Sequence, residues 1–145
     1  MFRAIDLTTH EPIIILDRLS LELLTQTREQ CRAGMLGCPR CRIQVVLKAG
    51  EVIRHHFAHK SRCDCPMRHE PADLMAARAA LYNWLKTKFR DGTVLPEETP
   101  EGVSLLRPFD CWVVTKAGRR FAYQLRRSIT RSEQNRSMTF PQSVM

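Results

Sequence analysis

Four thiol and imidazole side chains in the first half of the sequence have the spacing of zinc ligands. Cys38 and Cys41 are separated by two residues, and His56 and His59 follow them after a turn. Two thiolates with this spacing can point their sulfurs at one ion, and a second pair at the far end of a hairpin completes a tetrahedron. Because four protein ligands leave no open position, the pattern predicts a structural zinc site.

The choice of the second ligand pair has alternatives. His55 with His59 leaves three intervening residues, as in an ordinary zinc finger, whereas His56 with His59 leaves two. Either Cys63 or Cys65 could replace a histidine or hold a second ion, although one intervening residue is a poor chelating spacing. We favour His56 and His59 as ligands and expect Cys63 and Cys65 to be buried thiols.

The chemistry of such a site requires reduced thiols. The longest apolar stretch, Pro12–Leu16, is far shorter than the roughly 20 residues of a membrane span, and the first residues are acidic where a signal peptide is basic. We therefore expect a soluble cytoplasmic protein without membrane contact, in which the six cysteines stay reduced. Cys31 and Cys111 stand apart from the clusters, which predicts simple buried thiols.

The charge of the chain favours a polyanionic partner. The formal net charge is +8, and residues 116–136 carry seven Lys or Arg against Glu133 alone. Such a strip can neutralise phosphates without selecting a base sequence, although alternating arginines are also common on solvated edge strands. Phe121 and Tyr123 lie in the same stretch and are expected to be core residues. The predicted nucleic-acid contacts are Arg119, Arg120, Arg127 and Arg131.

Apolar periodicity predicts the elements that would position the zinc ligands. Residues 2–6 and 12–17 are typical of a hairpin, and residues 18–32 have the spacing of a helix. Residues 43–48 and 51–57 predict a second hairpin, which turns at Ala49-Gly50. One ligand pair lies at each end of this second hairpin, so its closure would bring the four ligands together.

The second half of the chain has one strong helical pattern followed by strand patterns. Residues 70–90 predict a helix, residues 92–101 an exposed loop rich in Gly, Pro and Glu, and residues 103–115 and 119–129 two strands. With 43% hydrophobic and 26% charged residues, the composition is that of a folded globular protein. The apolar residues at helical spacing are Leu74, Ala77, Leu81, Leu85 and Phe89.

Three motifs of the first half resemble the N-terminal module of the CoiA-like competence protein family. They are Cys38-Pro39-x-Cys41, the run Val45-Val46-x-Lys48-x-Gly50, and His56-Phe57-Ala58-His59. In that family a nuclease core of the PD-(D/E)xK type follows the zinc module. The resemblance covers roughly residues 4–136 and makes DNA, rather than RNA, the expected partner.

The predicted helix at residues 70–90 resembles the first part of that nuclease core in pattern. In the family a cysteine precedes a helix with Glu, His and Lys at fixed intervals. Here Cys65 precedes Glu70, while Leu74 and Arg78 stand at the positions of the histidine and the lysine. The resemblance implies a catalytic role for Glu70, and the chemistry of the helix departs from the family at the other two positions.

Two later segments resemble the strands that carry the metal ligands in the family. Arg107–Asp110 is similar to the strand with the metal-binding aspartate, and Phe121–Arg126 to a strand that normally carries Glu and Gln. Gln124 therefore stands where a carboxylate is expected. In such nucleases carboxylates hold Mg²⁺, which polarises the phosphate and activates a water. The catalytic residues that the resemblance implies around Mg²⁺ are Glu70, Asp110, Gln124 and Arg126.

These patterns together predict an α+β chain of two parts. Residues 1–65 would form a zinc-bound β-hairpin module, and residues 66–145 an incomplete restriction-endonuclease-like α-β-β unit, because the family pattern continues through a further helix and strand. The expected function is a DNA-associated zinc protein with a degenerate nuclease-like site, either a weak metal-dependent nuclease or a lapsed nuclease that still binds DNA. The alternatives are ordinary structural roles for Glu70 and Asp110, and a protein-interaction module such as an inhibitor or adaptor from a mobile element.

Overall fold

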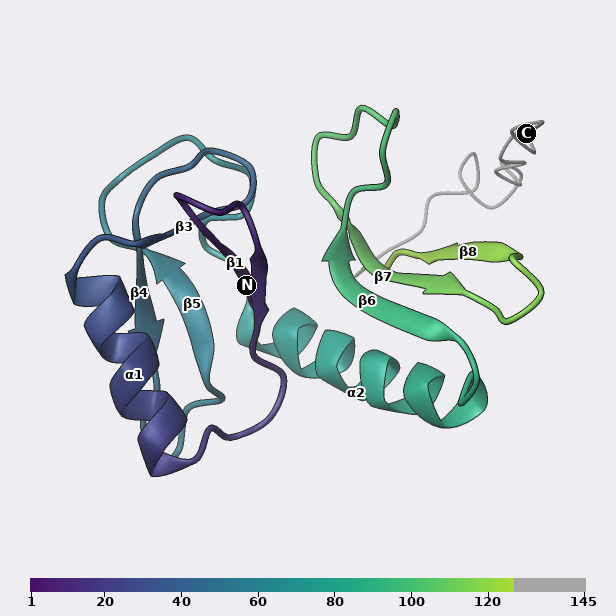
Figure 1. Cartoon of the computed structure of the whole chain (residues 1–145), viewed down its shortest axis with the longest axis horizontal. Helices are drawn as coiled ribbons and strands as arrows, with labels where there is room; N and C mark the ends of the chain where they lie inside the picture. Colours follow the sequence, from purple (N-terminus) through teal and green to yellow (C-terminus); the bar gives the residue numbers. More distant parts are fainter. Residues whose placement is uncertain (127–145) are drawn as a thin grey trace.

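Two helices and three small antiparallel sheets make up residues 1–126, the part of the chain that this computed structural model describes (Figure 1). The sheets have the strand orders β2-β1-β3, β4-β5 and β6-β7-β8. Mixed helix and strand content agrees with the predicted class. The elements are β1 (Arg3–Asp6), β2 (Pro12–Ile14), α1 (Leu21–Arg32), β3 (Leu36–Gly37), β4 (Val45–Lys48), β5 (His56–His59), α2 (Ala72–Lys88), β6 (Thr93–Glu98), β7 (Phe109–Val114) and β8 (Arg120–Tyr123).

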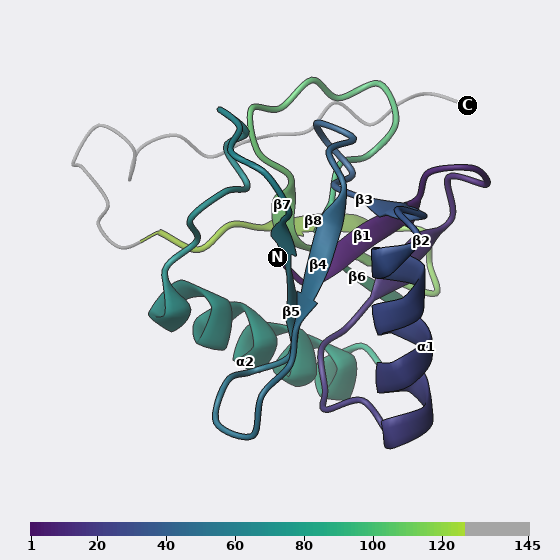
Figure 2. The same ribbon diagram turned by 90° about the vertical axis from the view of Figure 1, so that its left-hand side faces the viewer.

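Helix α1 packs against the β4–β5 hairpin (Figure 2). The predicted first hairpin is confirmed, whereas the second is right only in part, because its second strand is His56–His59 rather than residues 51–57. The helix begins after Ser20, whose hydroxyl accepts a hydrogen bond from the backbone N–H of Leu23 and so caps a free donor. Its buried residues are Thr27 and Cys31, whereas the side chain of Leu23 is exposed. Cys31 is therefore the buried thiol that was predicted.

Helix α2 lies between the N-terminal sheets and the β6-β7-β8 sheet (Figure 1). Leu85 packs there with Val94, Cys111 and Val113, so Cys111 is also a buried thiol as predicted. The predicted apolar face of the helix is only partly right, because Ala77 is exposed while Arg78 is buried. Hydrophobic spacing cannot identify a buried charged residue, whose burial depends on partners from distant segments.

The prediction of an exposed loop at residues 92–101 is wrong. Residues 93–98 form the strand β6, which pairs with β7, and both Pro96 and Glu97 are buried. β6 is an edge strand of its sheet, where a proline removes no ladder hydrogen bond that a neighbour needs. The Gly, Pro and Glu residues of this segment are typical of a loop. It is nevertheless a strand, because it pairs with β7.

The N-terminal strand connects the two halves of the chain. Phe2 is fully buried in a cluster with Leu16, Met75 and Ala79, the last two from α2. The carboxylate of Glu97 in β6 accepts hydrogen bonds from the backbone N–H groups of Phe2 and Arg3, at 2.8 and 2.9 Å. Residues 1–65 and residues 66–126 therefore share packed and hydrogen-bonded contacts.

Candidate functional site

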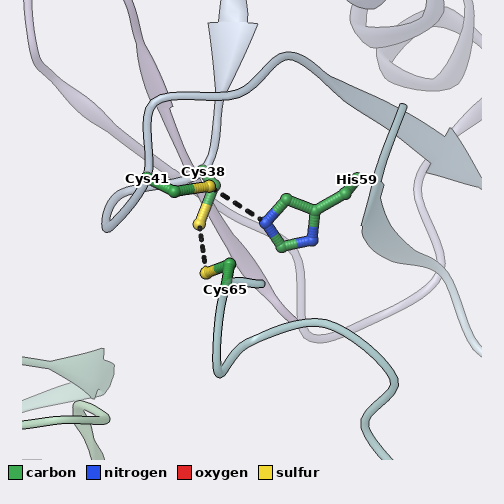
Figure 3. Close-up of side chains that lie close together, drawn as sticks. All are labelled: Cys38, Cys41, His59 and Cys65. Carbon is green, nitrogen blue, oxygen red and sulfur yellow. Dashed lines mark hydrogen bonds between the residues drawn. The ribbon is translucent and has the colours of Figure 1, made fainter. Parts of the chain in front are cut away.

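Three thiols and one imidazole converge beside the β4–β5 hairpin (Figure 3). The ligand atoms of Cys38, Cys41, His59 and Cys65 all lie within 4.8 Å of one another. Cys38 Sγ is 3.8 Å from Cys65 Sγ, and Cys41 Sγ is 3.3 Å from His59 Nε2. In a tetrahedron with Zn–S bonds of about 2.3 Å the sulfurs are roughly 3.8 Å apart. The cluster is compatible with a zinc site in both donor type and dimensions.

A tight turn between β3 and the bridge of Gly37 to Gln44 presents the first two thiols. Cys38 accepts a hydrogen bond from the N–H of Arg42 at its carbonyl and donates its own N–H to the carbonyl of Ile43, at 3.0 and 2.9 Å. A side chain at Gly37 would place its Cβ 2.5 Å from Leu7 Cδ2 and 2.9 Å from the Arg42 carbonyl oxygen. Only glycine fits at the base of this turn.

The fourth member of the group is Cys65, not the predicted His56. His56 and His59 both belong to β5, and residues three apart on a strand point to opposite faces. His59 lies on the face of the buried Phe57, whereas His56 Nδ1 donates to the carbonyl of Arg54 at 2.7 Å. A strand cannot direct both histidines at one ion, so a thiol from the following loop completes the group.

The other candidate ligands have different positions. Cys63 lies outside the group, and its carbonyl accepts a hydrogen bond from Arg68 at 3.2 Å. His55 is buried, and its Nδ1 accepts a hydrogen bond from the N–H of Leu19 at 3.1 Å, which fixes the start of α1 against the hairpin. His55 therefore has a structural contact in place of a ligand role. The Cys63 thiol is only half-buried, contrary to the expectation of a buried thiol.

Burial affects the protonation of the candidate zinc ligands. It raises the pKa of the Cys38 thiol to about 12, so this thiol ionises near neutral pH only beside a strong cation such as a metal. Burial also lowers the pKa of His59, and the charges of the N-terminal amine and Arg68 act in the same direction. His59 is therefore neutral at pH 7, which is the form that ligates a metal.

A second polar centre lies where β1, α2, β6 and β7 meet. The buried guanidinium of Arg78 donates from Nε to Asp110 Oδ1 at 2.6 Å and from Nη1 to Glu97 Oε1 at 2.7 Å. It also contacts both carboxylate oxygens of Glu70, with Nη1 2.7 Å from Oε2. All four side chains are at most 3% exposed. We call Glu70, Glu97 and Asp110 the carboxylate cluster.

Further groups satisfy the outer oxygens of the carboxylate cluster. The N-terminal amine of Met1 lies 3.7 Å from Glu70 Oε2, and Arg107 Nη2 lies 3.1 Å from Glu70 Oε1. Asp110 Oδ2 accepts hydrogen bonds from Gln124 Nε2 at 3.0 Å and from the backbone N–H of Leu125 at 2.6 Å. Among the described residues no buried side-chain nitrogen or oxygen lacks a hydrogen-bond partner.

The neighbouring charges shift the pKa values of Glu70 and Arg78. Burial alone would raise the pKa of Glu70, but the hydrogen bonds and charge of Arg78, with the N-terminal amine and Arg107, lower it below the usual 4.5. Burial alone would likewise lower the pKa of Arg78, but its hydrogen bonds to Glu70 and the nearby carboxylate charges raise it above its usual range. Arg78 and Glu70 therefore stabilise each other's charged forms.

The residues implied by the nuclease resemblance are partly brought together. Glu70 and Asp110 both contact Arg78, and Gln124 donates to Asp110. Glu70 also accepts a hydrogen bond from Arg107. Arg126 is exposed and follows β8. The sequence patterns did not identify Glu97 as a site residue, because it lies between two prolines in a segment without strand periodicity. The register opposes it to Asp110, between the pairs Pro96↔Cys111 and Glu98↔Phe109.

The predicted nucleic-acid contacts are only partly within the described residues. Arg119 and Arg120 are exposed at the turn from β7 to β8, whereas Arg127 and Arg131 lie outside the described residues. Tyr123 packs against the core of α2 and its sheet as expected, but Phe121 is 40% exposed, contrary to the expectation. No helix within residues 1–126 is long and apolar enough to cross a lipid bilayer.

Comparison with known proteins gives one match. Residues 16–68, less than half of the chain, match the family model described as competence protein CoiA, N-terminal domain. The matched range includes Cys38, Cys41, His59 and Cys65 and ends before Glu70. It supports the CoiA-like resemblance for the part of the chain that carries the candidate metal centre. Searches of curated proteins and of solved structures found no significant match.

Proposed function

We propose that this chain is a competence-related, zinc-stabilised protein that associates with nucleic acid and has a nuclease-like site without metal-dependent cleavage activity. The single observation that carries the proposal is the position of Arg78. Its guanidinium lies among Glu70, Glu97 and Asp110, where a divalent cation would have to lie to use the same oxygens.

Charge counting supports this reading of the carboxylate cluster. Glu70, Glu97 and Asp110 contribute three negative charges, and Arg78, Arg107 and the N-terminal amine contribute three positive ones. A divalent cation added to this balanced group would meet a buried guanidinium at close range. Mg²⁺ binding depends on carboxylate oxygens that are free to coordinate. The cluster is therefore proposed to be closed to Mg²⁺.

The neutral side chain of Gln124 fits the same reading. Its amide nitrogen donates to Asp110 Oδ2, so it satisfies this oxygen without adding negative charge. A glutamate at position 124 would add a fourth carboxylate to a cluster that already has a cation of its own. Replacement of the family's carboxylate and burial of Arg78 are thus two changes that compensate each other electrostatically.

The candidate zinc centre would position this cluster. Cys65 precedes Glu70 by five residues, and Arg68 between them donates its backbone N–H to the Cys65 carbonyl at 3.0 Å. An ion held by Cys38, Cys41, His59 and Cys65 would fix the start of the segment that leads to Glu70 and α2. Zinc in such a closed site supplies structural stability rather than chemistry.

A cleavage assay tests the proposed lack of catalysis. We expect no cleavage of single-stranded, duplex or branched DNA by the wild type with Mg²⁺ or Mn²⁺. Gln124→Glu with Arg126→Lys should also stay inactive, because the planar guanidinium of Arg78 still occupies oxygens of all three carboxylates. Arg78→Lys with Gln124→Glu brings back the lysine and the carboxylate expected from the family and leaves Leu74 unchanged. This variant should raise metal-dependent cleavage above background, because a lysine ammonium cannot contact all three carboxylates at once.

Two outcomes would contradict the proposal. Efficient cleavage by the wild type that Asp110→Asn abolishes and Glu51→Gln leaves intact would show that the cluster is an active metal site. Glu51 is exposed and far along the chain from the cluster, which makes it a matched control. If the doubly changed protein folds, binds zinc and still cuts no DNA or RNA, the nuclease-like description of the scaffold is wrong.

A protein-interaction module is the second candidate function. It is favoured by apolar side chains on the surface at one end of α1 and at the β4–β5 turn, where Leu21 is 79%, Val52 97% and Ile53 56% exposed. Arg28 Nη2 donates to the carbonyl of Ala49 at 2.9 Å, which ties this turn to α1. Absence of nucleic-acid binding at low salt would favour this candidate over the first.

A further inference from the structure

Six cations gather where the end of α2 meets the turn from β7 to β8. All six side chains are exposed, and Asp91 is the single acidic residue in segments 84–93 and 114–121. Within residues 1–126 none of the six is paired with a carboxylate. Unpaired cations of one sign attract polyanions. The six are Lys86, Lys88, Arg90, Lys116, Arg119 and Arg120.

The two segments form one continuous surface. Phe89, just after α2, stacks on Phe121 of β8 with ring centroids 6.0 Å apart, and both segments lie at the same end of the molecule (Figure 1). A groove of about 480 Å³ lies between them, and its charged lining is Lys88, Arg90 and Asp91 on one side and Lys116 on the other. A phosphate chain that follows this groove would meet cations on both sides.

Two aromatic rings are exposed among these cations. Trp84 is 51% exposed and Phe121 is 40% exposed. Lys88 Nζ lies 4.8 Å from the centre of the Trp84 ring, which places a cation beside a flat apolar face. Flat rings among cations are the arrangement on which unpaired bases stack while their phosphates are neutralised. We name Trp84, Phe121 and the six cations the basic–aromatic surface.

We infer that the basic–aromatic surface binds single-stranded nucleic acid without sequence preference. The inference rests on the proposed association with nucleic acid and names the surface and the form of nucleic acid. Bases in a duplex stack on one another, so their faces are closed to protein rings, whereas a single strand offers every base face. An acidic protein would account for the cations but not for exposed rings between them.

Fluorescence anisotropy of the zinc-loaded full chain tests this inference. The probes are a labelled oligothymidine, a mixed-sequence single strand and a duplex of equal length, each at two salt concentrations. We expect the single strands to bind at least tenfold more tightly than the duplex. Trp84→Ala should weaken single-strand binding by about tenfold, while Trp84→Phe keeps most of the affinity because a ring remains.

Charge variants test the cations separately. Replacing Lys116, Arg119 and Arg120 together by Ala should reduce the slope of log Kd against log salt by about 2, because three phosphate contacts are lost. The matched control replaces Arg18, Arg32 and Lys48 by Ala, which removes the same charge from exposed positions in the N-terminal half. The control should leave affinity within about twofold and the slope unchanged.

The outcomes distinguish this inference from the proposed function. Equal affinity for duplex and single strand, with no effect of Trp84→Ala, overturns the inference and leaves nucleic-acid association standing. If both triple variants lose the same affinity for single strands, the binding site lies elsewhere, and the inference is overturned. Two outcomes overturn both the inference and the proposed association with nucleic acid. One is that no nucleic acid binds at low salt, and the other is that the protein binds only vesicles that contain phosphatidylserine.

Discussion

Cys65→Ser is expected to remove zinc and unfold the N-terminal half, whereas Cys63→Ser should keep both zinc and fold. The reason is that Cys65 Sγ belongs to the group of four ligand atoms and Cys63 does not. Structural zinc contributes about 10 kcal/mol or more of folding free energy in small sites. The buried Val45 and Phe57 pack with Cys38 in one cluster, so loss of the ion should disrupt that core.

Elemental analysis and thermal unfolding measure this effect. The wild type, purified without chelator, should carry about one zinc per chain, and Cys65→Ser about none. His59→Gln should behave like Cys65→Ser, and His56→Gln like the wild type, because these two histidines point to opposite faces of β5. A full zinc content in Cys65→Ser, or a zinc content near two per chain in the wild type, would contradict the ligand set.

Arg78→Met is expected to destabilise the protein by about 3–5 kcal/mol at pH 7, because it leaves three buried carboxylates without their cation. Arg107→Met is the matched control. Arg107 contacts the same carboxylate of Glu70 but is 37% exposed, so its loss should cost at most about 1 kcal/mol. Urea unfolding at pH 7 measures both values.

The change of the free energy of unfolding with pH should have opposite signs in the wild type and in Arg78→Met. In the wild type the pKa of Glu70 is lowered, so its contribution to stability is present above pH 4.5 and is lost as the pH falls through the lowered value. In the variant, Arg78 no longer offsets the burial of Glu70, which raises the pKa of Glu70 above that of the unfolded chain. The stability of the variant should therefore increase, relative to wild type, as the pH falls from 7 to 5.

Arg78→Lys is a second variant at this position, with an expected stability between those of Arg78→Met and the wild type. If Arg78→Met does not fold, Arg78→Lys should fold with a smaller loss, because it keeps the charge but cannot contact three carboxylates with one planar group. Equal stability of Arg78→Met and wild type at pH 7, with the same pH profile, would contradict the structural role of the guanidinium.

Local patterns in the sequence correctly predicted the elements that depend on neighbouring residues. The turn of Cys38 and Cys41, the first hairpin, the strand β4 of the second and the long helix α2 all follow from short spacings and apolar periodicity. Strand alternation itself could have excluded His56 once β5 was known to include both histidines. The resemblance also indicated that Glu70, Asp110 and Gln124 would lie together.

Contacts between segments far apart in the sequence determined the fourth candidate zinc ligand, the strand β6 and the burial of Arg78. Cys65 joins the candidate zinc centre from a loop without secondary-structure periodicity, and its spacing from Cys63 gave no signal. Glu97 is buried because β6 pairs with β7, a contact across the loop at residues 99–108. By sequence Arg78 occupies the position of the family's lysine, but nothing in the helical pattern indicates that its side chain is buried. Its burial becomes favourable only where carboxylates from α2's preceding loop, β6 and β7 surround it, since a buried charge needs partners that no local pattern specifies.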